Sequence, residues 1–200
     1  MRPTFPPCPL DRARRGPAAG YTLMELLTVV FLIGLLATMA LPRLDVSSYR
    51  TDQGMHQVGT VMLTAQRAAV MKQHDVVVAF DSANNRLRVH DDLNNDGAMD
   101  AGERIVYQPL GDGVVFGRGG APAQAIGAGP ITFTRLQGGL KAVTFLRNGS
   151  ASEEGGVYLT SRRAAMVAGR EKDARLVLVS RATGRASWLT YTSGQWKTEF

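Results

Sequence analysis

The chain has 200 residues, 44% of them hydrophobic and 20% charged, with a formal net charge of +6. A chain of this composition can bury a core, which excludes an intrinsically disordered protein. The single cysteine excludes a disulfide within the chain and therefore a small disulfide-stabilised domain. The charge is uneven, because the first twenty residues carry four arginines and one aspartate and so contribute +3 of the total.

Residues 1–20 are rich in proline and arginine and show no hydrophobic period, which predicts a targeting segment outside the fold. The segment that follows, Leu26 to Leu41, is uncharged and mostly apolar and resembles a membrane span. Glu25 lies at its entrance. A carboxylate near the hydrocarbon region costs about 2–4 kcal/mol, so its presence needs an explanation.

Three interpretations of this segment are open. A secretory signal peptide would be cut in the small residues "ATMA", residues 37–40. A plain anchor would use the stretch from Tyr21 to Leu41, about 31 Å as a helix, to tether a periplasmic domain. Neither alternative accounts for Glu25.

The third interpretation accounts for it. Gly20, Tyr21, Glu25, the apolar run and Pro42 resemble the leader of type IV pilins and pseudopilins. The resemblance implies that a prepilin peptidase cuts after Gly20 and methylates the new amine of Tyr21. It also implies that Glu25 neutralises the Tyr21 amine of an adjacent subunit in a filament.

Residues 45–74 contain no proline, and their apolar or small residues recur at helical spacing. These are Val58, Val61, Met62, Ala65, Ala68, Ala69 and Met71. We therefore expect the membrane helix, residues 21–42, to continue as an amphipathic helix over residues 43–75.

The remainder, residues 76–200, reads as a β-rich globular domain. Nine short segments are rich in β-branched and aromatic residues and are separated by Gly, Asn, Asp and Ser. They are residues 75–80, 86–90, 104–108, 113–117, 131–135, 142–147, 156–160, 174–180 and 185–191. Residues 84–85 and 183–184 predict hairpin turns, and the glycine-rich stretch 117–130 predicts a loop. The expected fold class is α+β, with a long N-terminal helix packed on antiparallel sheet.

Three segments in this order, "TAQRAAVMKQHDVVVAF", "VTFLRNG" and "LVLVSRATGRAS", resemble the H-type minor pseudopilins of type II secretion and the FimT-like minor pilins. The resemblance implies a pilin-like subunit of a secretion pseudopilus or a type IV pilus. It implies as partners the prepilin peptidase, the other subunits of the filament and inner-membrane lipid. It further implies a single-pass protein of the inner membrane whose C-terminal domain lies in the periplasm and reaches the filament tip after assembly.

The segment "DDLNNDGAMDAGE" matches the spacing of a calcium loop, with oxygen ligands at alternate positions and a glycine for the turn. The candidate ligands are Asp92, Asn94, Asp96, Asp100 and Glu103, with Gly97 at the turn. The alternative is a solvated hairpin loop, because Asp, Asn and Gly are common turn residues. The sequence implies no other cofactor.

Residues 162–200 hold eight Lys or Arg against three acids, with aromatic residues interleaved. Arg181 and Arg185 are the candidates for binding DNA phosphates, with stacking by Trp188, Tyr191 and Trp196. DNA-binding FimT-like pilins carry a "GRxR" element. Here Gly184 and Arg185 are followed by Ala-Ser, so the second arginine is missing and DNA is not the expected partner.

Nothing in the sequence predicts an enzyme. His56, His74 and His90 are scattered, and the serines have no nucleophile-elbow context. The expected role is therefore assembly.

Overall fold

A computed structural model of the chain describes residues 20–40 and 46–199. The chain divides between Asp45 and Val46 into two units, which are considered separately. Within the described residues, no helix has the combined length and hydropathy needed to cross a membrane. Residues 41–45, where the predicted membrane helix would run into the amphipathic one, lie outside the described residues.

The first unit contains helix α1, Leu23–Ala40. Thr22 precedes the helix, and its Oγ1 accepts a hydrogen bond from the Glu25 backbone N–H at 3.2 Å. Thr22 and Glu25 have the spacing of a capping box, in which a hydroxyl satisfies one of the free N–H groups of the first turn. Every described side chain of α1 is exposed.

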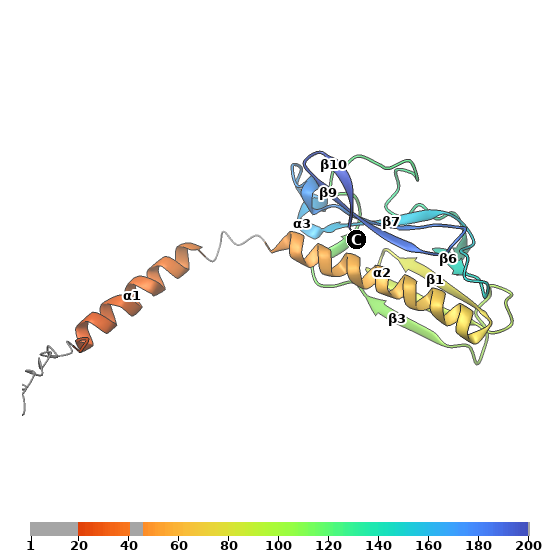
Figure 1. Cartoon of the computed structure of the whole chain (residues 1–200), viewed down its shortest axis with the longest axis horizontal. Helices are drawn as coiled ribbons and strands as arrows, with labels where there is room; N and C mark the ends of the chain where they lie inside the picture. The colour runs from red at the N-terminus through yellow and green to blue at the C-terminus, as the bar shows by residue number, and fades with distance from the viewer. Residues whose placement is uncertain (1–19, 41–45, 200) are drawn as a thin grey trace, which may run out of the picture. The chain divides into compact units, whose positions relative to one another are not determined.

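The second unit places helix α2, Ser47–Lys72, against two five-stranded sheets (Figure 1). The first sheet has the order β3-β2-β1-β6-β5, and the second β10-β9-β8-β7-β4. All strand pairs are antiparallel. The first sheet comprises β1 (Asp75–Asp81), β2 (Arg86–Asp92), β3 (Ile105–Pro109), β5 (Leu136–Gln137) and β6 (Leu140–Phe145). The second comprises β4 (Val114–Phe116), β7 (Gly155–Ser161), β8 (Arg175–Val179), β9 (Ala186–Thr192) and β10 (Gln195–Glu199), with α3 (Arg162–Met166) and the 3-10 helix η2 (Glu171–Asp173) between β7 and β8.

The core lies between α2 and the two sheets. Met55, Val58 and Met62 of α2 are fully buried in one cluster with apolar residues of both sheets. Phe80 of β1 stacks on Phe133 with ring centroids 5.4 Å apart. This arrangement confirms the predicted α+β class, with the strands distributed over two sheets.

The predicted stripe of α2 is correct except at its end. Met71 is 83% exposed, whereas Ala69 is buried. Two residues turn an α-helix by about 200°, so the two side chains point in nearly opposite directions. Val61 and Ala68 are half-buried at the margin of the stripe.

The predicted strand 131–135 is wrong. Ile131 forms only an isolated bridge with Val157, and the backbone N–H groups of Thr134 and Arg135 donate to the Glu153 carboxylate at 2.9 Å. A side chain therefore takes the place of a neighbouring strand there.

Strand β10 was not predicted, although the Ser193-Gly194 turn before it, with both φ angles positive, is a hairpin signal.

The two predicted hairpin turns are confirmed. Asn85 has a φ of 46° between β1 and β2, and Gly184 has a φ of 61° between β8 and β9. A Cβ at Gly184 would lie 2.3 Å from the Gly149 carbonyl oxygen, so glycine is required there for close approach as well as for the turn.

Candidate functional site

The predicted processing and assembly residues lie at the start of α1. Gly20 and Tyr21 precede the helix, and Glu25 is in its first turn. The positive end of the helix dipole stabilises a carboxylate at this position. The Glu25 carboxylate is exposed and has no partner among the described residues, so it is available to an external cation.

The loop from Asp92 to Glu103 leaves the end of β2 and returns to the start of β3. Its first and last carboxylates bind its own backbone. Asp92 Oδ2 accepts from the Gly97 N–H at 2.7 Å, and Glu103 Oε1 accepts from the Leu93 N–H at 2.9 Å. The loop is thus a closed turn structure held at both ends by acidic side chains.

His90 anchors this loop to the sheet, and sequence reasoning missed its role. The side chain of His90 is fully buried on β2. Gln137 Nε2 donates to His90 Nδ1 at 2.9 Å and to the Gly97 carbonyl at 3.0 Å. His90 Nε2 is therefore the protonated nitrogen, and it donates to Glu103 Oε2 at 2.6 Å.

These contacts favour the ionised form of Glu103. Hydrogen bonds from the Asp100 N–H and then from the His90 side chain lower the pKa of Glu103 from its ordinary 4.5 to about 2. The one available sequence signal was strand alternation, since Arg88, His90 and Asp92 fall on one face of β2 and all three are buried.

The predicted calcium ligands are brought together but do not fit a calcium ion as they stand. Asn94 Nδ2, a hydrogen-bond donor, lies 2.9 Å from both Asp96 Oδ2 and Asp100 Oδ2, where a cation would have to bind. Both Glu103 oxygens accept N–H groups. Across residues 20–40 and 46–199, no group of three or more His, Cys, Asp or Glu side chains forms a metal site. Calcium binding stays a prediction that requires Asn94 and Glu103 to turn.

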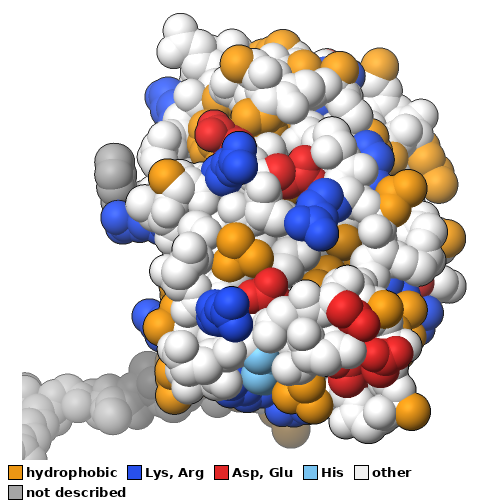
Figure 2. Space-filling model, turned by 90° about the vertical axis from the view of Figure 1, so that its right-hand side faces the viewer, with side chains coloured by type: hydrophobic (Ala, Val, Ile, Leu, Met, Phe, Trp, Pro, Cys, Tyr) orange, Lys and Arg blue, Asp and Glu red, His pale blue; other side chains and the backbone are white. Residues whose placement is uncertain are grey.

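The two candidate DNA-binding arginines are exposed in the turn between β8 and β9. The aromatic residues are engaged elsewhere: Trp196 packs between Tyr158 and Tyr191 and donates to the Pro122 carbonyl at 2.9 Å. Trp188 packs against Gly59 of α2. On the face shown in Figure 2, Lys and Arg side chains are scattered among acidic ones. The arginines therefore lack the stacking surface that single-stranded DNA requires.

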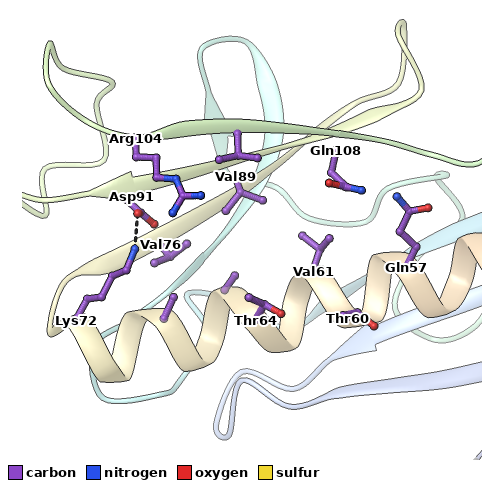
Figure 3. A pocket seen from close by; sticks show the side chains of 13 residues that line it. Gln57, Thr60, Val61, Thr64, Lys72, Val76, Val89, Asp91, Arg104 and Gln108 are labelled. Carbon is purple, nitrogen blue, oxygen red and sulfur yellow. Dashed lines mark hydrogen bonds and ion pairs between the residues drawn. The ribbon is translucent and has the colours of Figure 1, made fainter.

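A groove of about 450 Å³ separates α2 from the edge of the first sheet (Figure 3). Its lining is mainly apolar: Val61, Ala65 and Ala68 of α2, Val76 of β1, Val89 of β2 and Val106 of β3. Gln57 and Gln108 close one end, and Lys72, Asp91 and Arg104 the other. Sequence reasoning missed this groove, because it depends on the separation of two elements and not on the pattern of either.

Comparison with known proteins identifies the family of the chain. Residues 55–184, more than half of the chain, match the model of the family described as type II transport protein GspH. The structure of the minor pseudopilin EpsH from the type 2 secretion system of Vibrio cholerae has a TM-score of 0.45 and 14% identity, covering 70% of this chain and 97% of that chain. No curated protein sequence matches the chain.

Proposed function

Because the chain belongs to the GspH family and is a minor pseudopilin of type II secretion, we propose that it enters the pseudopilus after cleavage behind Gly20 and methylation of Tyr21. Its partners in the filament are other pseudopilins, and the pseudopilus is a membrane-associated periplasmic structure. The finer proposals are processing by the prepilin peptidase, a single span in inner-membrane lipid before assembly, and a position at the filament tip.

The observation that carries this proposal is the exposed carboxylate of Glu25 in the first turn of α1, for which residues 20–40 and 46–199 provide no partner. Cleavage after Gly20 creates an amine on Tyr21, four residues away. Within one helix the two groups stay at fixed positions, but in a staggered neighbour the amine can meet the carboxylate. The pair removes the cost of placing an isolated charge in an apolar environment, about 2–4 kcal/mol.

The proposal includes no catalysis. His90 is held between Glu103 and Gln137, and Ser161 Oγ donates to Asp173 Oδ2 at 2.6 Å, so neither has the partners of a nucleophile and its base. Each of these groups holds loops and helices in place within the fold.

Processing is tested by mass spectrometry of the mature N-terminus in cells that contain the secretion system. We expect N-methylated Tyr21 as the first residue. A chain that begins at Leu41 would support a signal peptide, and an uncut chain would support a plain anchor; either result contradicts the proposal.

Assembly is tested with Glu25→Ala and Glu25→Gln, and Glu25→Asp serves as the charge-retaining control. All three variants keep Gly20 and should be cut normally. We expect the Ala and Gln variants to be lost from cross-linked pseudopilus while the Asp variant retains partial incorporation, because only a carboxylate neutralises an amine. Normal incorporation of Glu25→Ala shows that the proposed pairing is wrong.

A further inference from the structure

Strand β3 is the edge of the first sheet, and no other described strand pairs with its outer backbone. The Asp91 N–H donates to the Arg104 carbonyl at 3.0 Å, so these two residues form a hydrogen-bonded pair. Bonded and non-bonded pairs alternate in an antiparallel ladder. Val106 is therefore bonded to β2, whereas Ile105 and Tyr107 direct their N–H and C=O groups to the open edge.

The side chains of β3 alternate as well. Arg104, Val106 and Gln108 line the groove, so Ile105 and Tyr107 lie on the opposite face of the sheet. Arg86 covers the Tyr107 ring at 4.2 Å from its centroid, which occupies that face. A strand added at this edge would direct every second side chain into the apolar groove between β3 and α2 (Figure 3).

The two ends of the groove differ in charge. At the Gln57 end, Gln57 Nε2 donates to the Pro109 carbonyl at 2.7 Å, so the groups there are neutral and hydrogen-bonded to each other. At the other end Lys72 is paired with Asp91 at 2.5 Å. Arg104 is exposed and has no ion-pair partner among the described residues, so its guanidinium is available to an acidic group of a partner.

We propose that an extended segment of another polypeptide binds β3 as a sixth strand of the first sheet. Its alternate apolar side chains fill the groove, and an acidic side chain pairs with Arg104. Hydrogen bonds to Ile105 and Tyr107 supply affinity, and the groove and Arg104 select the sequence. A second copy of β3 fits less well, because "IVYQP" contains no acid to meet Arg104 and both copies are positively charged.

The test uses the full chain in detergent micelles and fluorescent synthetic peptides. The probe is an acetylated hexapeptide of alternating threonine and valine with a glutamate at one end, made with the glutamate first or last to allow both strand directions. Its counterpart carries lysine in place of glutamate. Binding is followed by fluorescence anisotropy, and thermal melts confirm that each variant is folded.

The edge is probed with Ile105→Pro and its matched control Ile105→Ala. Ile105 is the first residue of β3 and its N–H points away from β2, so proline is tolerated there and removes only an edge donor. We expect Ile105→Pro to weaken binding of the glutamate peptide about tenfold, because the variant loses one hydrogen bond and the proline ring keeps the peptide backbone from approaching β3 closely. Ile105→Ala should bind as the wild type does.

The charge is probed with Arg104→Glu, which should bind the lysine peptide and reject the glutamate peptide. The proposal is overturned if the wild type does not bind the glutamate peptide, if it binds both peptides equally, or if Ile105→Pro binds unchanged. Self-association of the chain that Ile105→Pro abolishes would also overturn it, by assigning the edge to a second copy. These readouts do not involve the leader and are independent of processing and Glu25.

Discussion

Gly59 sets how closely Trp188 approaches α2. A Cβ at this position would lie 1.9 Å from Trp188 Nε1, and that indole nitrogen is buried without a hydrogen-bond partner among the described residues. Gly59→Ala gains helix propensity but forces the ring outward, so we expect a net loss of about 1–2 kcal/mol in the free energy of unfolding. Gly111→Ala is the control, because a Cβ there meets nothing within 4 Å. Chemical denaturation measures both, and equal stabilities would contradict the packing described.

Because of Glu103, the free energy of unfolding depends on pH in the acid range. Its pKa is about 2 in the folded chain and returns to its ordinary 4.5 on unfolding, so the unfolded chain takes up the proton first as the pH falls. The stabilisation from this carboxylate is complete above pH 4.5 and is lost toward pH 2. We expect Glu103→Gln to be less stable than the wild type at pH 6, with the difference narrowing as the pH falls from 4.5 toward 2 in urea melts. Glu154→Gln, at an exposed carboxylate, should show no such convergence.

Among the elements, the loop between β2 and β3 offers the sharpest contrast between motif and structure. In the structure its acidic groups accept hydrogen bonds from backbone N–H groups, Asn94 and His90, so calcium can bind only if Asn94 and Glu103 turn. A loop that binds calcium in this way would raise the Tm in millimolar calcium, and Asp96→Asn would reduce that rise; an unchanged Tm would support the solvated hairpin loop. Thermal melts of the full chain in calcium and in chelator distinguish the two, with magnesium as the control for ionic strength.

For the whole molecule, the distribution of charge argues against nucleic acid. Removal of residues 1–20 lowers the formal net charge from +6 to +3, and the aromatic residues near the C-terminus pack internally. Because non-specific DNA binding depends on many phosphate contacts, we expect no gel shift at about 150 mM salt with a chain that lacks residues 1–20. A shift that disappears in the Arg181→Glu, Arg185→Glu double variant would support the DNA-binding alternative.

Local sequence patterns predicted most of the helices, strands and turns of the fold. The stripe of α2, eight of the nine predicted strands to within about two residues at their ends, and both hairpin turns follow from side-chain period and turn chemistry. The strand predicted at 131–135 fails because Glu153, eighteen residues away from Arg135, takes its hydrogen bonds. No short stretch of the sequence contains both Glu153 and the backbone N–H groups that it binds.

By itself, the sequence determined the amphipathic helix, the β-rich domain and, through its match over residues 55–184, the family; the leader with Gly20, Tyr21 and Glu25 is its prediction. Only the tertiary structure decided the bonding of His90 to Gln137, 47 residues away, and the groove between α2 and the open edge of β3. The reason is physical: periodicity is fixed by the geometry of one element, whereas hydrogen-bond partners and cavities depend on how separate elements pack.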